Sequence, residues 1–136
     1  MSATQLERIE SLKIGVISGT ATSVSFSLIA LTHSLIVSSS PSLLDWASWP
    51  IVVSGAIAFI SGFLFGVTYR YVVQAAPNPH LKSGAVMAFG LVRGLAQLDV
   101  GLQLQGNPVL MAVQVGESVV MFAIAALILD QVIDKQ

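Results

Sequence analysis

The sequence predicts an all-α protein, a four-helix transmembrane bundle that forms a single integral membrane domain over residues 1–136. Composition is the first observation behind this prediction. Only 10% of the residues are charged and 54% are hydrophobic, whereas soluble domains carry about 25% charged residues. Segmentation is the second, because four apolar stretches reach the length of about 20 residues that a helix needs to cross a bilayer. We therefore expect lipid, not water, around most of the chain.

Residues 4–13 come before the first apolar stretch and predict a short N-terminal surface helix. Thr4 and Glu7 have the spacing of a capping box at the start of a helix. In this motif the threonine side chain accepts a hydrogen bond from a backbone N–H, and the glutamate side chain accepts one from the backbone N–H of the threonine. The alternative is a docking element for a partner. The apolar stretch that follows, from Ile14 to Val37, is longer than the roughly 7–15 residues of a signal-peptide core, so we expect it to be retained.

The four predicted spans are separated by short connections with turn-forming residues. The spans cover residues of about 14–37, 49–70, 83–102 and 108–130. The connections contain SSSPS at 38–42, APNP at 76–79, and Gly106 and Asn107 before Pro108. Proline and glycine end helices, and proline is also favoured in the first helical turn. Because the connections are short, neighbouring helices are expected to run antiparallel.

Basic residues predict the orientation of the bundle. Every lysine and arginine except Arg93 lies before the first span, at the facing ends of the second and third, or after the fourth. The connections at 38–48 and 103–107 contain none. The positive-inside rule then places both termini in the cytoplasm, or in the stroma of a plastid. Aromatic residues at the two ends of the second span, Trp46 with Trp49 and Tyr69 with Tyr71, have the positions of interfacial belts.

Two charged residues lie about halfway along apolar spans, Arg93 in the third and Glu117 in the fourth. An unpaired charge in the middle of a membrane costs roughly 2.5–3.5 kcal/mol on insertion scales, and a carboxylate partner recovers much of it. The two spans should be antiparallel neighbours, which brings both residues to similar depth. The sequence therefore predicts an intramembrane Arg93–Glu117 ion pair. Such a pair is either a structural lock, a relay for protons or ions, or a contact for a lipid, pigment or partner subunit.

Two glutamines extend this polar pattern. Gln97 is one helical turn after Arg93, and Gln114 lies close to one turn before Glu117. Because the third span runs outward and the fourth returns, Gln97 and Gln114 are predicted to meet as a polar helix contact.

Glycines recur at a spacing of four residues in three of the spans. Glycine lets two helix backbones approach closely in lipid, where no hydrophobic drive holds helices together. These residues are predicted to be helix-packing glycines, either inside the bundle or against another subunit. The pairs are Gly15 with Gly19, Gly62 with Gly66, and Gly90 with Gly94.

No catalytic, metal or cofactor motif is found, so we expect a protein that is not an enzyme and that holds no cofactor or metal. His33 near the end of the first span could in principle ligate a chlorophyll magnesium or a haem iron, but no second histidine lies at matching depth. Cysteine is absent, which excludes disulfides and thiolate sites. The net charge of −1 and the lack of a basic stripe exclude nucleic acid as a partner.

Residues 66–99 resemble a family of small multi-span membrane proteins of cyanobacteria and chloroplasts. The resemblance rests on Tyr69-Arg70-Tyr71, Asn78-Pro79-His80 and Leu91-Val92-Arg93-Gly94. It implies a bacterial inner membrane or a thylakoid membrane and a role beside photosynthetic complexes, with no established activity.

The function that this sequence predicts is that of a non-enzymatic membrane accessory, assembly or scaffolding subunit. Its partners would be membrane lipids and other membrane protein subunits, or further copies of the chain. The alternative is a small oligomeric channel or transporter that uses Arg93 and Glu117.

Overall fold

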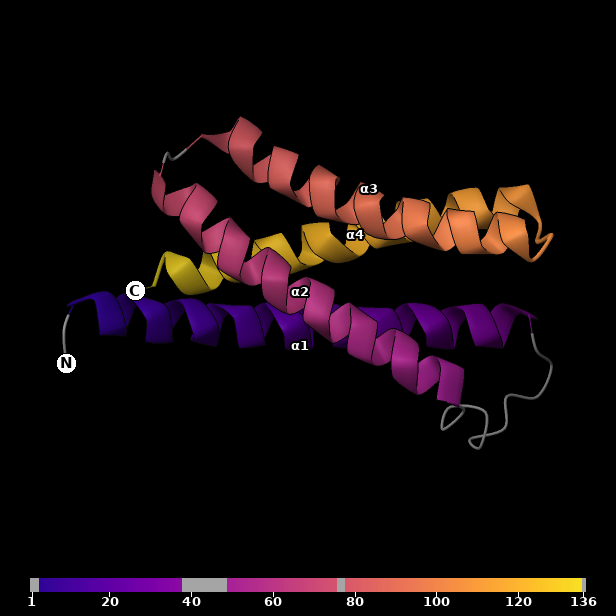
Figure 1. Ribbon diagram of the computed structural model, residues 1–136, viewed down its shortest axis with the longest axis horizontal. Coiled ribbons are helices and arrows are strands. Elements are labelled where there is room, and N and C mark those ends of the chain that lie inside the picture. Colours follow the sequence, from indigo (N-terminus) through magenta and orange to yellow (C-terminus); the bar gives the residue numbers. More distant parts are fainter. Residues whose placement is uncertain (1–2, 38–48, 76–77, 136) are drawn as a thin grey trace.

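The computed structural model describes residues 3–37, 49–75 and 78–135 and contains four helices there (Figure 1). They are α1 (Ala3–Val37), α2 (Trp49–Ala75), α3 (Pro79–Gln103) and α4 (Pro108–Ile133). Each is long and apolar enough to cross a membrane. The predicted fold class is confirmed, and each predicted span lies inside one helix.

One predicted element is wrong. Residues 4–13 are not a separate surface helix but the first turns of α1, which continues without a break to Val37. Ser11 in this stretch and Ile14 just after it are buried against the other helices, whereas the other side chains of residues 4–13 are exposed. The beginning of α1 is therefore part of the bundle, because its polar side chains bind a buried arginine of α2 that is described below.

Asparagine and proline begin the third and fourth helices. Asn78 accepts a hydrogen bond from the backbone N–H of His80, and Asn107 accepts one from Val109, each at 2.9 Å. A proline follows each asparagine at the first helical position, where its missing N–H costs nothing. The turn between α3 and α4 contains Gln105 in the left-handed region, with φ of 55°. The SSSPS segment at 38–42 and Trp46 lie outside the described residues.

The helices form two pairs (Figure 1). α2 crosses α1 obliquely, and α3 runs beside α4, while α4 also packs on α1. The starts of α1 and α3 and the ends of α2 and α4 lie together at one end, which we call the terminus end. The opposite end, with the α3–α4 turn, is called the turn end. From the terminus end toward the turn end, α2 and α3 diverge (Figure 1).

Glycines lie at the crossing of α1 and α2. A Cβ built on Gly66 would lie 2.5 Å from the Cβ of Ser18 and 2.9 Å from the carbonyl oxygen of Ile14. On Gly62 it would overlap the hydroxyl of Thr22, and on Gly15 and Gly19 it would touch Phe63 and Phe59 at 2.8 and 3.0 Å. A side chain at any of these four glycine positions would therefore force atoms of the neighbouring helix to shift. Thr22 uses the close approach to donate a hydrogen bond across it, to the carbonyl of Ala58 at 3.0 Å.

Glycines also lie at the contact between α3 and α4. A Cβ on Gly90 would lie 2.7 Å from the Cα of Val119, and a Cβ on Gly94 would lie 2.8 Å from the Cα of Val115. Both obstacles are backbone atoms, which cannot rotate away. All six predicted packing glycines thus face neighbouring helices of the same chain.

An aromatic cluster joins the two helix pairs. We give this name to Phe65 and Tyr69 of α2, Phe89 of α3 and Phe122 of α4. Phe65 contacts the other three, with ring centroids 5.1–5.4 Å apart, and Phe89 lies 5.8 Å from Phe122. Ile14, Met121, Ala125 and Leu129 complete the buried core around it. At 1.5 Å per residue, the three phenylalanines lie about 15 Å from the terminus end of their helices.

Tyr69 was predicted to belong to an interfacial belt and does not. Its side chain is only 1% exposed, because it lies in this core, whereas Tyr71 and Trp49 are exposed as a belt requires.

We predict that Gly94→Ala destabilises the bundle. The added methyl must displace the α4 backbone at Val115, which we expect to cost about 1–3 kcal/mol, as overpacking does in well-packed cores. The free energy of unfolding in mixed micelles measures the change. The matched control is Gly116→Ala, since a Cβ there meets no atom within 4 Å. Equal effects of the two substitutions would contradict the assigned contact.

Candidate functional site

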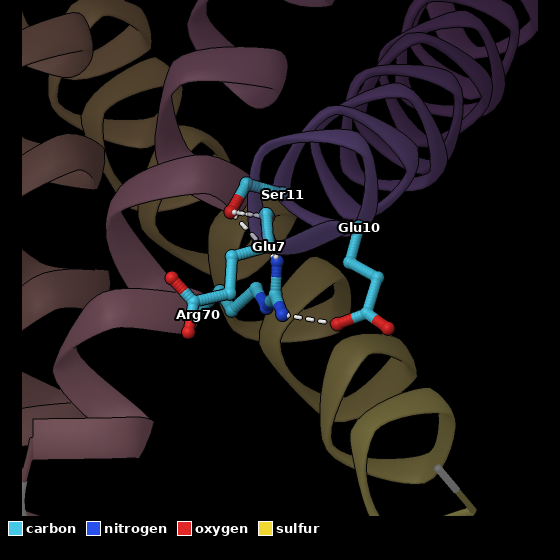
Figure 2. Close-up of polar contacts among 4 residues, drawn as sticks. All are labelled: Glu7, Glu10, Ser11 and Arg70. Atoms are coloured by element: carbon cyan, nitrogen blue, oxygen red, sulfur yellow. Dashed lines mark hydrogen bonds and ion pairs between the residues drawn. The ribbon is translucent and has the colours of Figure 1, made fainter. Parts of the chain in front are cut away.

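Arg70 forms a polar cluster at the terminus end (Figure 2). Although it is a charged side chain, it is only 3% exposed. Its guanidinium donates to the carbonyl oxygen of Glu7 and to the hydroxyl of Ser11, each at 2.7 Å, and forms an ion pair with Glu10. Figure 2 shows that this guanidinium, from α2, lies against one face of the first turns of α1. These bonds replace the water that the arginine loses on burial.

A second polar cluster lies at the same end. One carboxylate oxygen of Asp130 in α4 accepts from the hydroxyl of Tyr69 and from the ammonium of Lys82, both at 2.9 Å. The cluster therefore ties α2 and α3 to α4, while Arg70 ties α2 to α1. All four helices are joined by these bonds at the terminus end.

Sequence reasoning used Arg70 and Lys82 only as markers of orientation and missed these clusters. A usable signal was present. Glu7 and Glu10 precede the first span and Arg70 ends the second, so opposite charges lie at the same membrane boundary once the spans are antiparallel. What the sequence does not give is the rotation of each helix about its own axis.

Arg93, Glu117, Gln97 and Gln114 all line one cavity of about 160 Å³ between α1, α3 and α4. His33 also lines it, together with apolar residues that include Phe26 and Met121. This volume suffices for about five water molecules at roughly 30 Å³ each. Arg93 and the two glutamines in addition line a second, larger space, described below.

The predicted Arg93–Glu117 ion pair is not formed. In the described part of the chain the ion pairs are Arg70–Glu10 and Lys82–Asp130. The physical reason is the rotation of α4. Val115 and Val119 face Gly90 and Gly94 of α3, and Glu117 lies about 160° around the helix from each of these valines. Glu117 therefore reaches the cavity from the side of α4 away from the α3 contact.

Arg93 instead lies against an aromatic ring. Its guanidinium carbon is 5.8 Å from the centroid of Phe26 in α1, within the range of a cation–π contact. Among the described residues, none accepts a hydrogen bond from Arg93. Glu117 likewise has no hydrogen bond or ion pair there.

The predicted Gln97–Gln114 contact is replaced by another. The side-chain oxygen of Gln97 accepts from the hydroxyl of Ser118, one turn further along α4 than Gln114, at 2.9 Å. Ser118 was not singled out in the sequence, because a lone serine in an apolar helix usually bonds its own backbone. Gln114 is exposed and has no hydrogen bond within the described residues, although it borders the same cavity as Gln97.

A groove of about 740 Å³ lies between α2 and α3. It is the space that opens where these helices diverge, and its lining is largely apolar. Arg93, Gln97 and Gln114 lie on its polar side. The remaining lining residues are Ser54, Ile57, Ser61, Leu64, Phe89, Val92, Ala96, Val100 and Gly101.

His33 is exposed and lies at the edge of the cavity. Among the described residues, no group of three or more histidines, cysteines, aspartates or glutamates could hold a metal ion. The role of His33 as a pigment or haem ligand therefore gains no support from its surroundings.

Comparison with known proteins gives no match. No family model, no curated protein and no solved structure is similar to this chain. Functional inference therefore rests on the arrangement of its own residues. That arrangement places a cation and amide donors at the border of two cavities, with a carboxylate lining one of them, inside a bundle that would sit in lipid.

We predict that Arg70→Met lowers the free energy of unfolding by about 1.5–3 kcal/mol, the range for hydrogen bonds to charged groups. Glu10→Gln should cost less than about 1 kcal/mol, because the Glu10 side chain is 48% exposed and exposed pairs contribute little. Unfolding in mixed micelles measures both. The control is Arg8→Met, at an exposed position of α1 near Glu10, which should change the free energy of unfolding little. A larger loss in R8M than in R70M would contradict the role of Arg70.

Proposed function

We propose that the protein is a non-enzymatic integral membrane accessory, assembly or scaffolding subunit. The observation that carries the proposal is the aromatic cluster, which fills the centre of the bundle. Phe65 is fully buried there, in contact with rings from both helix pairs. In this arrangement the cavities end at the cluster, and the bundle offers a fixed body for attachment.

The outer surface of the helices supports attachment inside the bilayer. Large apolar side chains are exposed along all four helices, as contact with lipid or with another membrane protein requires. On α4 these surround Gly116, where no atom lies within 4 Å of an added Cβ. Because the six predicted packing glycines are occupied within the chain, docking of a partner helix would use this face of α4.

The membrane and the partner in this proposal are inferred from the sequence. The resemblance of residues 66–99 favours a bacterial inner membrane or a thylakoid membrane, with a photosynthetic complex as the partner. The orientation we propose has both termini in the cytoplasm or stroma. It is supported by the bonds of Arg70 to the beginning of α1 and of Lys82 to the end of α4, which place these basic residues at the same end as both termini.

A small channel or transporter is the second candidate, because Arg93 and Glu117 line a common cavity. A solute could enter this cavity from the turn end. To cross the membrane it would then have to pass the aromatic cluster, which requires the two helix pairs to separate.

The two candidates differ in what they expect of Arg93→Leu combined with Glu117→Leu. In an accessory subunit the double variant should fold at least as well as either single variant, since no isolated charge remains beside the cavity. Unfolding in mixed micelles measures this. In a transporter the double variant should abolish flux even where the bundle folds. Flux by the purified protein in liposomes that is lost in the double variant would contradict the accessory role.

Attachment through α4 has its own test. We predict that mild-detergent extraction from native membranes yields a discrete assembly larger than the protein alone, and that Gly116→Leu dissociates it. Gly84→Leu is the matched control, since Gly84 also faces open space but lies on α3. Native gel migration with mass identification is the measurement. Extraction of the unaltered protein only as a monomer would contradict the proposal.

A further inference from the structure

Three side chains at the border between the cavity and the groove have unused N–H groups. Arg93 has five N–H donors and, among the described residues, no hydrogen-bond acceptor for them; its guanidinium lies over the Phe26 ring. Gln97 accepts from Ser118 through its oxygen, which leaves its amide nitrogen without an acceptor in that set. Gln114 makes no hydrogen bond within it either. Unsatisfied donors are costly in hydrocarbon, where water does not compensate them.

Of these donors the Arg93 guanidinium lies deepest, whereas Gln97 and Gln114 lie about 9 Å from the turn end of their helices at 1.5 Å per residue. Arg93 is about 15 Å from the turn end of α3 and Phe26 about 16 Å from that of α1, counted at 1.5 Å per residue. The contact between them holds the guanidinium near this depth instead of letting it extend to the membrane surface. A hydrocarbon layer is about 30 Å thick, so the guanidinium is close to its middle.

The groove beside these donors has the size and character of a ligand site. Its volume of about 740 Å³ lies within the usual range of roughly 300–1,000 Å³ for small-molecule sites. Its walls are largely apolar, with the donors on one side. Because it lies between two membrane-spanning helices that diverge, a ligand dissolved in the bilayer reaches it laterally.

We propose that this groove binds a neutral, lipid-soluble carbonyl compound of the isoprenoid quinone type, whose carbonyl oxygens accept hydrogen bonds from Arg93, Gln97 and Gln114. The hydrocarbon part of the ligand lies along the apolar walls formed by Ile57, Leu64 and Val100. This proposal is independent of attachment through α4.

Two features favour a neutral head group over an anionic one. Glu117 lines the same cavity as Arg93, so an anionic head group would meet an acidic side chain of the protein there. Phospholipid head groups remain at the membrane surface, whereas the Arg93 guanidinium lies near its middle. A quinone ring combines hydrogen-bond acceptors with solubility in the hydrocarbon layer.

The test is saturable binding of radiolabelled decylubiquinone to the full chain in lipid nanodiscs, relative to empty nanodiscs. We expect unlabelled decylubiquinone to compete and tetradecane, which has no oxygen, not to compete. Stronger competition by oleate than by decylubiquinone would overturn the inference of a neutral head group. Absence of saturable binding, or equal competition by tetradecane, would overturn the site itself.

Variants distinguish the contribution of the hydrogen-bond donors to binding from that of the apolar walls. Ala96→Trp fills the groove without altering a donor and should abolish saturable binding, whereas Ala112→Trp, on an exposed face of α4 outside both cavities, should preserve it. Arg93→Leu should weaken binding about tenfold or more and Gln114→Leu about threefold to tenfold, as expected for charged and neutral hydrogen bonds. Gln131→Leu, an exposed position of α4, is the control for Gln114→Leu. Unchanged binding in both A96W and R93L would overturn the assignment.

Discussion

Close approach of helix backbones at glycine is the constraint on which the rest of this structure depends. In lipid, helices gain little from burying apolar side chains, so van der Waals contact between backbones must hold them. Gly62 and Gly66 admit Thr22 and Ser18 of α1, and Gly90 and Gly94 admit the α4 backbone at Val119 and Val115. These contacts fix not only the distance but the rotation of each helix. The rotation in turn decides which polar residues meet.

The two glycine-packed pairs are joined unevenly. At the terminus end, Arg70 binds α1, and Asp130 receives bonds from Tyr69 and Lys82, so every helix has a polar contact with another. The aromatic cluster fills the centre beside them. Toward the turn end, α2 leaves α3 (Figure 1), and no ion pair or side-chain hydrogen bond between described residues joins these two helices there. The cavity and the groove follow from this asymmetry, because both lie on the turn-end side of the aromatic cluster.

The sequence was sufficient for the helices and insufficient for the pairing of their polar residues. Length and hydropathy located α3 and α4 to within a few residues, and Pro108 marked the start of α4, since these signals are local. Asn78 and Pro79, assigned to a connection, in fact begin α3. Arg93 and Glu117 were placed correctly in depth, and both reach one cavity, because depth depends only on counting residues along antiparallel helices. Their ion pair failed because pairing depends on rotation, which Val115 and Val119 determine by packing on glycine. Tyr69 was misplaced for the same reason, since belt positions at one end of a helix differ only in the direction they face.

The surroundings of Arg93 depend both on its depth along α3 and on the rotation of α3 about its own axis. Gly90 and Gly94 bring one side of α3 onto α4, and Arg93 is offset from that side, so the arginine projects beside the contact and not into it. There it borders both the cavity, which it shares with Glu117, and the groove between α2 and α3. A residue that served only to lock two helices would be satisfied by the helices it locks. The Arg70 guanidinium meets that description, with acceptors from a carbonyl, a hydroxyl and a carboxylate. Arg93 has the same chemistry but no hydrogen-bond acceptor among the described residues, and this contrast within one molecule is the reason to assign it to a ligand.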